Sequence, residues 1–164
     1  MGFARNWQNK KGEYFGIPYI EQWQRIVRWH SRLMILNDQV PGTDSNGLMD
    51  HVYACLQNCL MFRDWLSGCY VSKKAVNALY GSRELKLCRD IANGTKHFKI
   101  DKPSVDANFL TVCEYLPPPV GQTEGSSYKL TLCADGDYYD LIELCTKCVK
   151  QIENFMESIN SADR

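Results

Sequence analysis

Residues 89–98, RDIANGTKHF, hold the densest group of side chains in the chain that could take part in chemistry. Within nine residues the segment places Arg89, Asp90, Asn93, Lys96 and His97. Histidine exchanges protons near neutral pH, and lysine or arginine beside it could hold a phosphodiester and stabilise charge that develops on its oxygens. These residue types therefore fit acid–base chemistry at a phosphate.

The spacing of the same residues predicts a helix over residues 82–98, with Ser82 as its N-cap. At about 100 degrees per residue, one side of this helix is apolar and is expected to face the core: Leu85, Cys88, Ile91, Ala92 and Thr95. The opposite side is a polar stripe: Lys86, Asp90, Asn93 and His97, with Arg89 and Lys96 along its edge. A functional cluster and a solvated helix face both fit this stripe, and the residues alone leave the two open.

Gly94 lies inside the predicted helix, where glycine costs about 1 kcal/mol relative to alanine. This cost indicates either that another backbone or a ligand comes close to Gly94, or that the helix ends or bends there.

The polar residue and the histidine of this segment resemble the signature of HEPN domains, in which an arginine directly precedes the polar residue. Asn93 and His97 match the polar and histidine positions, Ala92 stands at the arginine position, and Arg89 lies one turn earlier. The resemblance implies a helical bundle that forms homodimers and brings two Arg/His sets into one cleft. It also implies metal-independent RNA cleavage, in which the ribose 2′-hydroxyl attacks the adjacent phosphate, histidine transfers protons and arginine stabilises the transition state.

On this resemblance, the candidate catalytic residues are Arg89, Asn93 and His97, and the candidate substrate-binding residues are Lys96 and Asp90. No cofactor is expected. The leading hypothesis is an RNA-directed protein of a bacterial defence, toxin or mobile-element system; because some HEPN domains bind without cutting, endoribonuclease activity stays open. The alternative is a non-catalytic protein-interaction or antitoxin-like regulatory module whose polar stripe binds a protein partner.

The elements that must position these residues follow from the apolar spacing. Further helices are expected over residues 20–36, about 48–67, around 72–81 and about 140–159. Two β-rich runs flank the loop PPPVGQTEGSS and predict a hairpin within residues 108–134, followed by a turn and helix cap in ADGDYYD. Two strands alone are only marginally stable, so the hairpin should pack on the helices.

The predicted fold is therefore α+β and predominantly α: a HEPN-like bundle of four to five helices with a β-hairpin inserted before the C-terminal helix. The length of 164 residues fits one domain, 1–164, with residues 1–18 as an N-terminal arm. No stretch reaches the roughly 20 apolar residues that span a bilayer, and the first residues lack the apolar core of a signal peptide. We expect a cytoplasmic protein with no membrane partner.

Net charge and the positions of the cysteines exclude some classes of function. The 19 basic and 19 acidic side chains give a formal net charge of zero, which excludes a passive nucleic-acid coat but allows a local basic site. Of the 8 cysteines, Cys55, Cys59, Cys145 and Cys148 continue apolar helical stripes and are expected in the core. The others are scattered singly, so no metal site is predicted, and a zinc-stabilised module is the third alternative.

Overall fold

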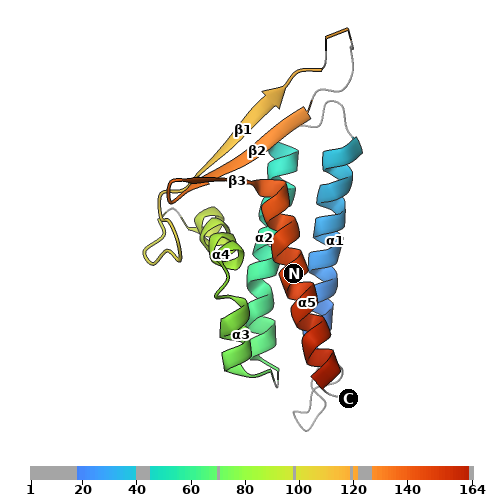
Figure 1. Cartoon of the computed structure of the whole chain (residues 1–164), viewed down its shortest axis with the longest axis vertical. Coiled ribbons are helices and arrows are strands. Elements are labelled where there is room, and N and C mark those ends of the chain that lie inside the picture. Colours follow the sequence, from blue (N-terminus) through green and yellow to red (C-terminus); the bar gives the residue numbers. More distant parts are fainter. Residues whose placement is uncertain are drawn as a thin grey trace.

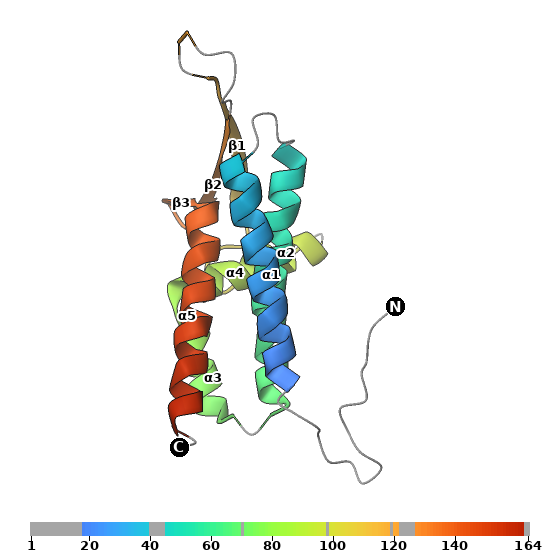
Figure 2. The ribbon, with the colours of Figure 1, turned by 90° about the vertical axis from the view of Figure 1, so that its right-hand side faces the viewer.

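Three long helices run side by side in the computed structural model, which describes residues 18–39, 45–69, 71–97, 99–118, 120–121 and 127–162 (Figures 1 and 2). They are α1 (Pro18–Gln39), α2 (Ser45–Ser67) and α5 (Leu141–Ala162). The shorter helices α3 (Lys73–Leu79) and α4 (Arg83–Lys96) pack against α2 and α5. Among the residues described, no helix is both long and apolar enough to cross a membrane.

An antiparallel sheet stands at one end of the helices (Figure 1). Its strands lie in the order β1 (Leu110–Leu116), β2 (Ser127–Ala134) and β3 (Asp137–Asp140). The predicted α+β, predominantly α class is thereby confirmed. The expected N-terminal arm lies outside the described residues, apart from Pro18.

The core is built from the apolar stripes that the sequence predicted. On α2 the fully or almost fully buried positions recur every three or four residues: Leu48, Val52, Cys55, Leu56, Cys59, Phe62 and Leu66. Cys145 and Cys148 of α5 are also buried, and all four predicted core cysteines are free thiols. In the described part of the chain, no three His, Cys, Asp or Glu side chains are arranged to hold a metal ion.

Cys88 of α4 joins these thiols at the centre of the bundle. A hydrogen bond with Cys148 raises the pKa of Cys88 well above its ordinary value, and burial adds to the effect. Hydrogen bonding with Cys55 raises the pKa of Cys59 and of Cys145 in the same way. These three thiols therefore stay protonated at neutral pH and pack as small apolar residues.

Helix α4 begins as predicted, because the Ser82 side chain accepts a hydrogen bond from the backbone N–H of Leu85 at 3.3 Å. It ends earlier than predicted, at Lys96. His97 leaves the helix in an extended conformation, with φ −121° and ψ 139°. Its backbone N–H still donates to the Asn93 carbonyl at 2.8 Å, so the histidine is held one turn beyond Asn93.

The segment expected to form only a turn and a helix cap also contains a third strand. Asp135 and Gly136 have φ values of 51° and 80°, and two successive positive φ values make the tight turn that suits a hairpin. This turn pairs Ala134 with Asp137 and so starts β3. The helix-cap prediction is confirmed, because Asp140 Oδ1 accepts a hydrogen bond from the Glu143 N–H at 2.9 Å.

Gly94 is approached closely by the side chain of Phe109. A Cβ atom at this position would lie 2.7 Å from Phe109 Cζ and 3.5 Å from Ile100 Cδ1. The missing side chain thus makes room for the Phe109 ring, which packs against the core just before β1 begins.

We expect Gly94→Ala to destabilise the protein by about 1 kcal/mol in chemical denaturation. Displacing the ring costs roughly 1–3 kcal/mol, and the better helix propensity of alanine offsets about 1 kcal/mol of that. The same substitution in a Phe109→Leu background, where the ring is absent, should be neutral or stabilising. Equal destabilisation in both backgrounds would show that the ring contact is not the reason for glycine.

Candidate functional site

Asp90, predicted to bind substrate, lies inside the fold with 1% of its surface exposed. Its Oδ1 accepts a hydrogen bond from the Ser104 N–H at 2.6 Å, and its Oδ2 accepts from the N–H groups of Val105 and Asp106 at 2.6 and 3.0 Å. Both carboxylate oxygens are therefore occupied by protein. The expected place of Asp90 on the polar stripe is wrong, because the segment after α4 folds back over this side of the helix and helical periodicity alone cannot predict that segment.

The other predicted site residues are accessible on α4 or at its end. Arg89 and Asn93 are partly exposed and lie one turn apart, so they share a face. Lys96 and His97 are exposed. His97 is eight positions after Arg89, which is roughly 12 Å along a helix axis, so the two lie far apart along this face. We call Lys86, Arg89, Asn93, Lys96 and His97 the α4 polar face.

The unpaired charges of this face are positive. The two acidic side chains of α4 are engaged in the fold: Asp90 as described, and Glu84 by accepting a hydrogen bond from Gln151 Nε2 at 2.8 Å. That hydrogen bond lowers the pKa of Glu84. By contrast, the three cations of the face form no hydrogen bond or ion pair with any residue that the structure describes: Lys86, Arg89 and Lys96.

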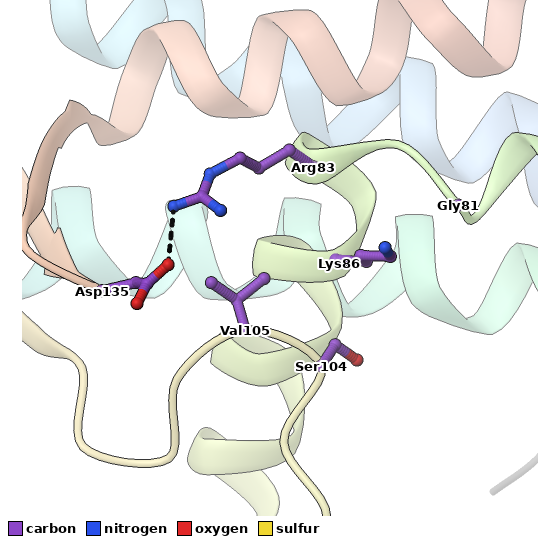
Figure 3. A pocket seen from close by; sticks show the side chains of 6 residues that line it. All are labelled: Gly81, Arg83, Lys86, Ser104, Val105 and Asp135. Atoms are coloured by element: carbon purple, nitrogen blue, oxygen red, sulfur yellow. Dashed lines mark hydrogen bonds and ion pairs between the residues drawn. The ribbon is translucent and has the colours of Figure 1, made fainter.

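A pocket of about 350 Å³ adjoins the start of α4 and extends the face (Figure 3). It is lined by Gly81, Arg83, Lys86, Ser104, Val105 and Asp135. Arg83 is already neutralised, because its guanidinium lies 3.2 Å from Asp135 Oδ2 and 3.3 Å from Asp137 Oδ2. Lys86 is therefore the lining cation without a partner in the described part of the chain, and it links the pocket to the α4 polar face.

Ser104 and Arg83 are pocket residues that the sequence analysis missed. The Ser104 hydroxyl oxygen is buried and has no hydrogen-bond partner among the residues that the structure describes. The only sequence signal at Arg83 was its place directly after the Ser82 cap. Its partners Asp135 and Asp137 are more than 50 residues away in the chain, so the pairing depends on tertiary structure and no local pattern could find it.

Comparison with models of known families, with curated proteins and with solved structures gave no match. The resemblance of the α4 segment to HEPN domains therefore stays a prediction that rests on Asn93, His97 and the displaced Arg89.

We expect Asp90→Asn to lower the free energy of unfolding by about 2–4 kcal/mol. The amide retains one acceptor oxygen but brings an NH₂ group to backbone N–H donors, which leaves buried donors unsatisfied. Asp101→Asn, at an exposed aspartate of the same loop, is the matched control and should change stability by less than about 0.5 kcal/mol. Thermal and urea unfolding measure both, and similar losses in the two variants would contradict the assigned role of Asp90.

Asp106 should make the free energy of unfolding fall as the pH is lowered into the acid range. Its carboxylate accepts hydrogen bonds from the N–H groups of Asp135 at 2.9 Å and Asn108 at 2.7 Å, and these lower its pKa. A lowered folded-state pKa contributes stability above the ordinary aspartate pKa of about 4, and this contribution is lost as pH falls through the folded value.

The stability difference between wild type and Asp106→Asn should therefore be largest at neutral pH and shrink toward pH 3. Urea unfolding at a series of pH values measures it, with Asp101→Asn as a control for the loss of one negative charge. A difference that grows as the pH falls would have the wrong sign for this role of Asp106.

Proposed function

We propose that this protein is an RNA-directed, HEPN-like protein of a bacterial defence, toxin or mobile-element system, and that it binds RNA through the α4 polar face. The observation that carries the proposal is the charge of this face. Lys86, Arg89 and Lys96 are cations without partners in the described part of the chain, on a helix whose two acidic side chains are held by other contacts. Local positive charge attracts a phosphate backbone even when net charge is zero.

Each residue of the face has a role in this proposal. Lys86, Arg89 and Lys96 contact phosphate oxygens, since a guanidinium and an ammonium are the usual donors to phosphate. Asn93, one turn from Arg89, donates its amide to a phosphate or ribose oxygen. His97 is the proton-transfer group, because imidazole is the side chain that most often serves as a general acid or base.

Cleavage requires more than binding. Within one chain Arg89 and His97 are separated by roughly 12 Å of helix, so a phosphate held by one is not automatically held by the other. The HEPN resemblance implies that two copies supply the catalytic groups jointly. We propose that, if this chain cuts RNA, His97 transfers the proton and Arg89, of the same or the second copy, stabilises charge on the reacting phosphate.

Binding of a labelled single-stranded RNA pool, measured at several salt concentrations, tests the proposal. Three phosphate contacts predict a slope of about −2 for log K against log[salt], since each contact on a single strand contributes about −0.7. Arg89→Ala should weaken binding and reduce the slope by about 0.7. Arg28→Ala, at an exposed arginine of α1 without a partner in the described residues, removes the same charge elsewhere and should leave the slope unchanged.

Cleavage of the same pool in EDTA separates a ribonuclease from an RNA-binding protein. If the protein cuts, wild type should release fragments with cyclic-phosphate ends, and His97→Ala should abolish cleavage while it retains most of the binding. Binding without cleavage would place the protein among those that bind only. No binding by wild type, or equal losses in Arg89→Ala and Arg28→Ala, would reject the α4 polar face as the RNA site.

A second candidate function, a non-catalytic protein-interaction module, is favoured by a different surface. The exposed large apolar side chains of the described residues are concentrated in the sheet and the loop after β1, including Leu110, Val112, Tyr115, Leu116 and Tyr138. Exposed apolar groups gathered in one part of a molecule mark protein contacts more often than nucleic-acid contacts.

A further inference from the structure

Strand β1 is an edge of the sheet whose outer side is open. Within the described part of the chain it pairs with β2 alone, in an uninterrupted register from Leu110 opposite Cys133 to Leu116 opposite Ser127. Edge strands that stay single are protected by charges, prolines or bulges. The seven residues of β1, LTVCEYL, contain no proline and one charge, Glu114, which lies opposite Lys129 of β2.

The outer face of the sheet is mostly apolar along this edge. Leu110, Val112 and Leu116 alternate on one face of β1 and are 65%, 46% and 38% exposed, and Glu114 is the one charged side chain of β1 on that face. The row that starts at Leu110 continues through Cys133 of β2 to Tyr138 of β3, which is 78% exposed. The far ends of β1 and β2 also extend past the ends of the helices (Figure 1), so the helices do not cover this part of the sheet.

We propose that β1 pairs antiparallel with β1 of a second copy of the chain, about a two-fold axis that passes through Cys113. A two-fold axis perpendicular to the sheet keeps the outer faces of both copies on the same side. Residues opposite each other must then point to the same face, so the axis has to pass through a residue and not between two.

The composition of β1 selects Cys113 among the central residues. An axis at Glu114 would set the two Glu114 carboxylates against each other, which is unfavourable for like charges in a cross-strand pair. An axis at Val112 would set Glu114 against the partner's Leu110 and leave Tyr115 and Leu116 beyond the partner's strand. The axis at Cys113 pairs all seven residues of β1.

In this register the leucines at the two ends of the strand contact each other across the axis. Leu110 lies opposite the partner's Leu116, Thr111 opposite the partner's Tyr115, and Val112 opposite the partner's Glu114. The Leu110 pair occurs twice by symmetry and buries part of the leucine surface that a single copy leaves exposed. Glu114 keeps Lys129 on its other side, so its charge retains an opposite charge across the strand. The result is a continuous six-stranded sheet.

Charge exchange at Leu110 and Leu116 tests the register by sedimentation velocity across the micromolar range. Wild type should be a dimer. The Leu110→Lys/Leu116→Lys variant sets lysine against lysine at both ends and should raise the dimer dissociation constant by at least about tenfold. The Leu110→Glu/Leu116→Lys variant sets glutamate against lysine and should recover most of the dimer. Both leucines are exposed, and circular dichroism checks that each variant is folded.

Cross-linking through Cys113 is a second, independent measurement of the same register. Cys113 is exposed and would face the partner's Cys113, so mild oxidation with copper phenanthroline should join the two thiols, with loss of two protons and two electrons to the oxidant. Cys113→Ser should abolish the linked dimer, and Cys133→Ser should retain it. A monomeric wild type, a Lys/Lys variant that stays dimeric, or a cross-link that survives Cys113→Ser would overturn the proposal. RNA binding by the α4 polar face is measured separately, since none of these substitutions alters it.

Discussion

The carboxylate of Asp90 is the contact on which the arrangement around α4 depends. It accepts hydrogen bonds from three consecutive backbone N–H groups, those of Ser104, Val105 and Asp106. A buried carboxylate is costly unless its oxygens are satisfied, and buried N–H groups are equally costly without an acceptor. Each side of this contact therefore requires the other. Asp106 continues the connection, because its own carboxylate accepts the N–H of Asp135 in the turn between β2 and β3.

This arrangement also determines the electrostatics of the surface. The Asp90 carboxylate accepts hydrogen bonds from the loop after α4, and the Glu84 carboxylate accepts one from Gln151 of α5. Both negative charges of α4 are therefore engaged within the protein. The positive charges of the same helix remain on the solvent side. The chain has no net charge, but it presents a local basic face. The reason is that the acidic side chains of α4 form contacts within the protein, whereas the basic side chains of the α4 polar face are left at the surface.

The sequence predicted what short-range patterns control. The apolar period of α2, the Ser82 cap and the Asp140 cap each depend on residues within a few positions of one another, and the structure confirms them. The burial of Asp90 could not be predicted from the sequence. An aspartate on the polar side of a helix is expected to face solvent unless the loop that covers it is known. The third strand was missed because its start depends on two positive φ values at Asp135 and Gly136.

Gly94 lies between the α4 polar face and the start of the edge strand β1. It directly follows Asn93 of the α4 polar face, and the space it leaves is filled by Phe109, the residue directly before β1. A larger residue there would push the ring outward and with it the start of β1, whose first residue, Leu110, is the end of the proposed dimer strand. The glycine that weakens α4 by about 1 kcal/mol is therefore best explained by tertiary packing, since it holds the sheet edge at a fixed place against the helix that carries Arg89 and Asn93.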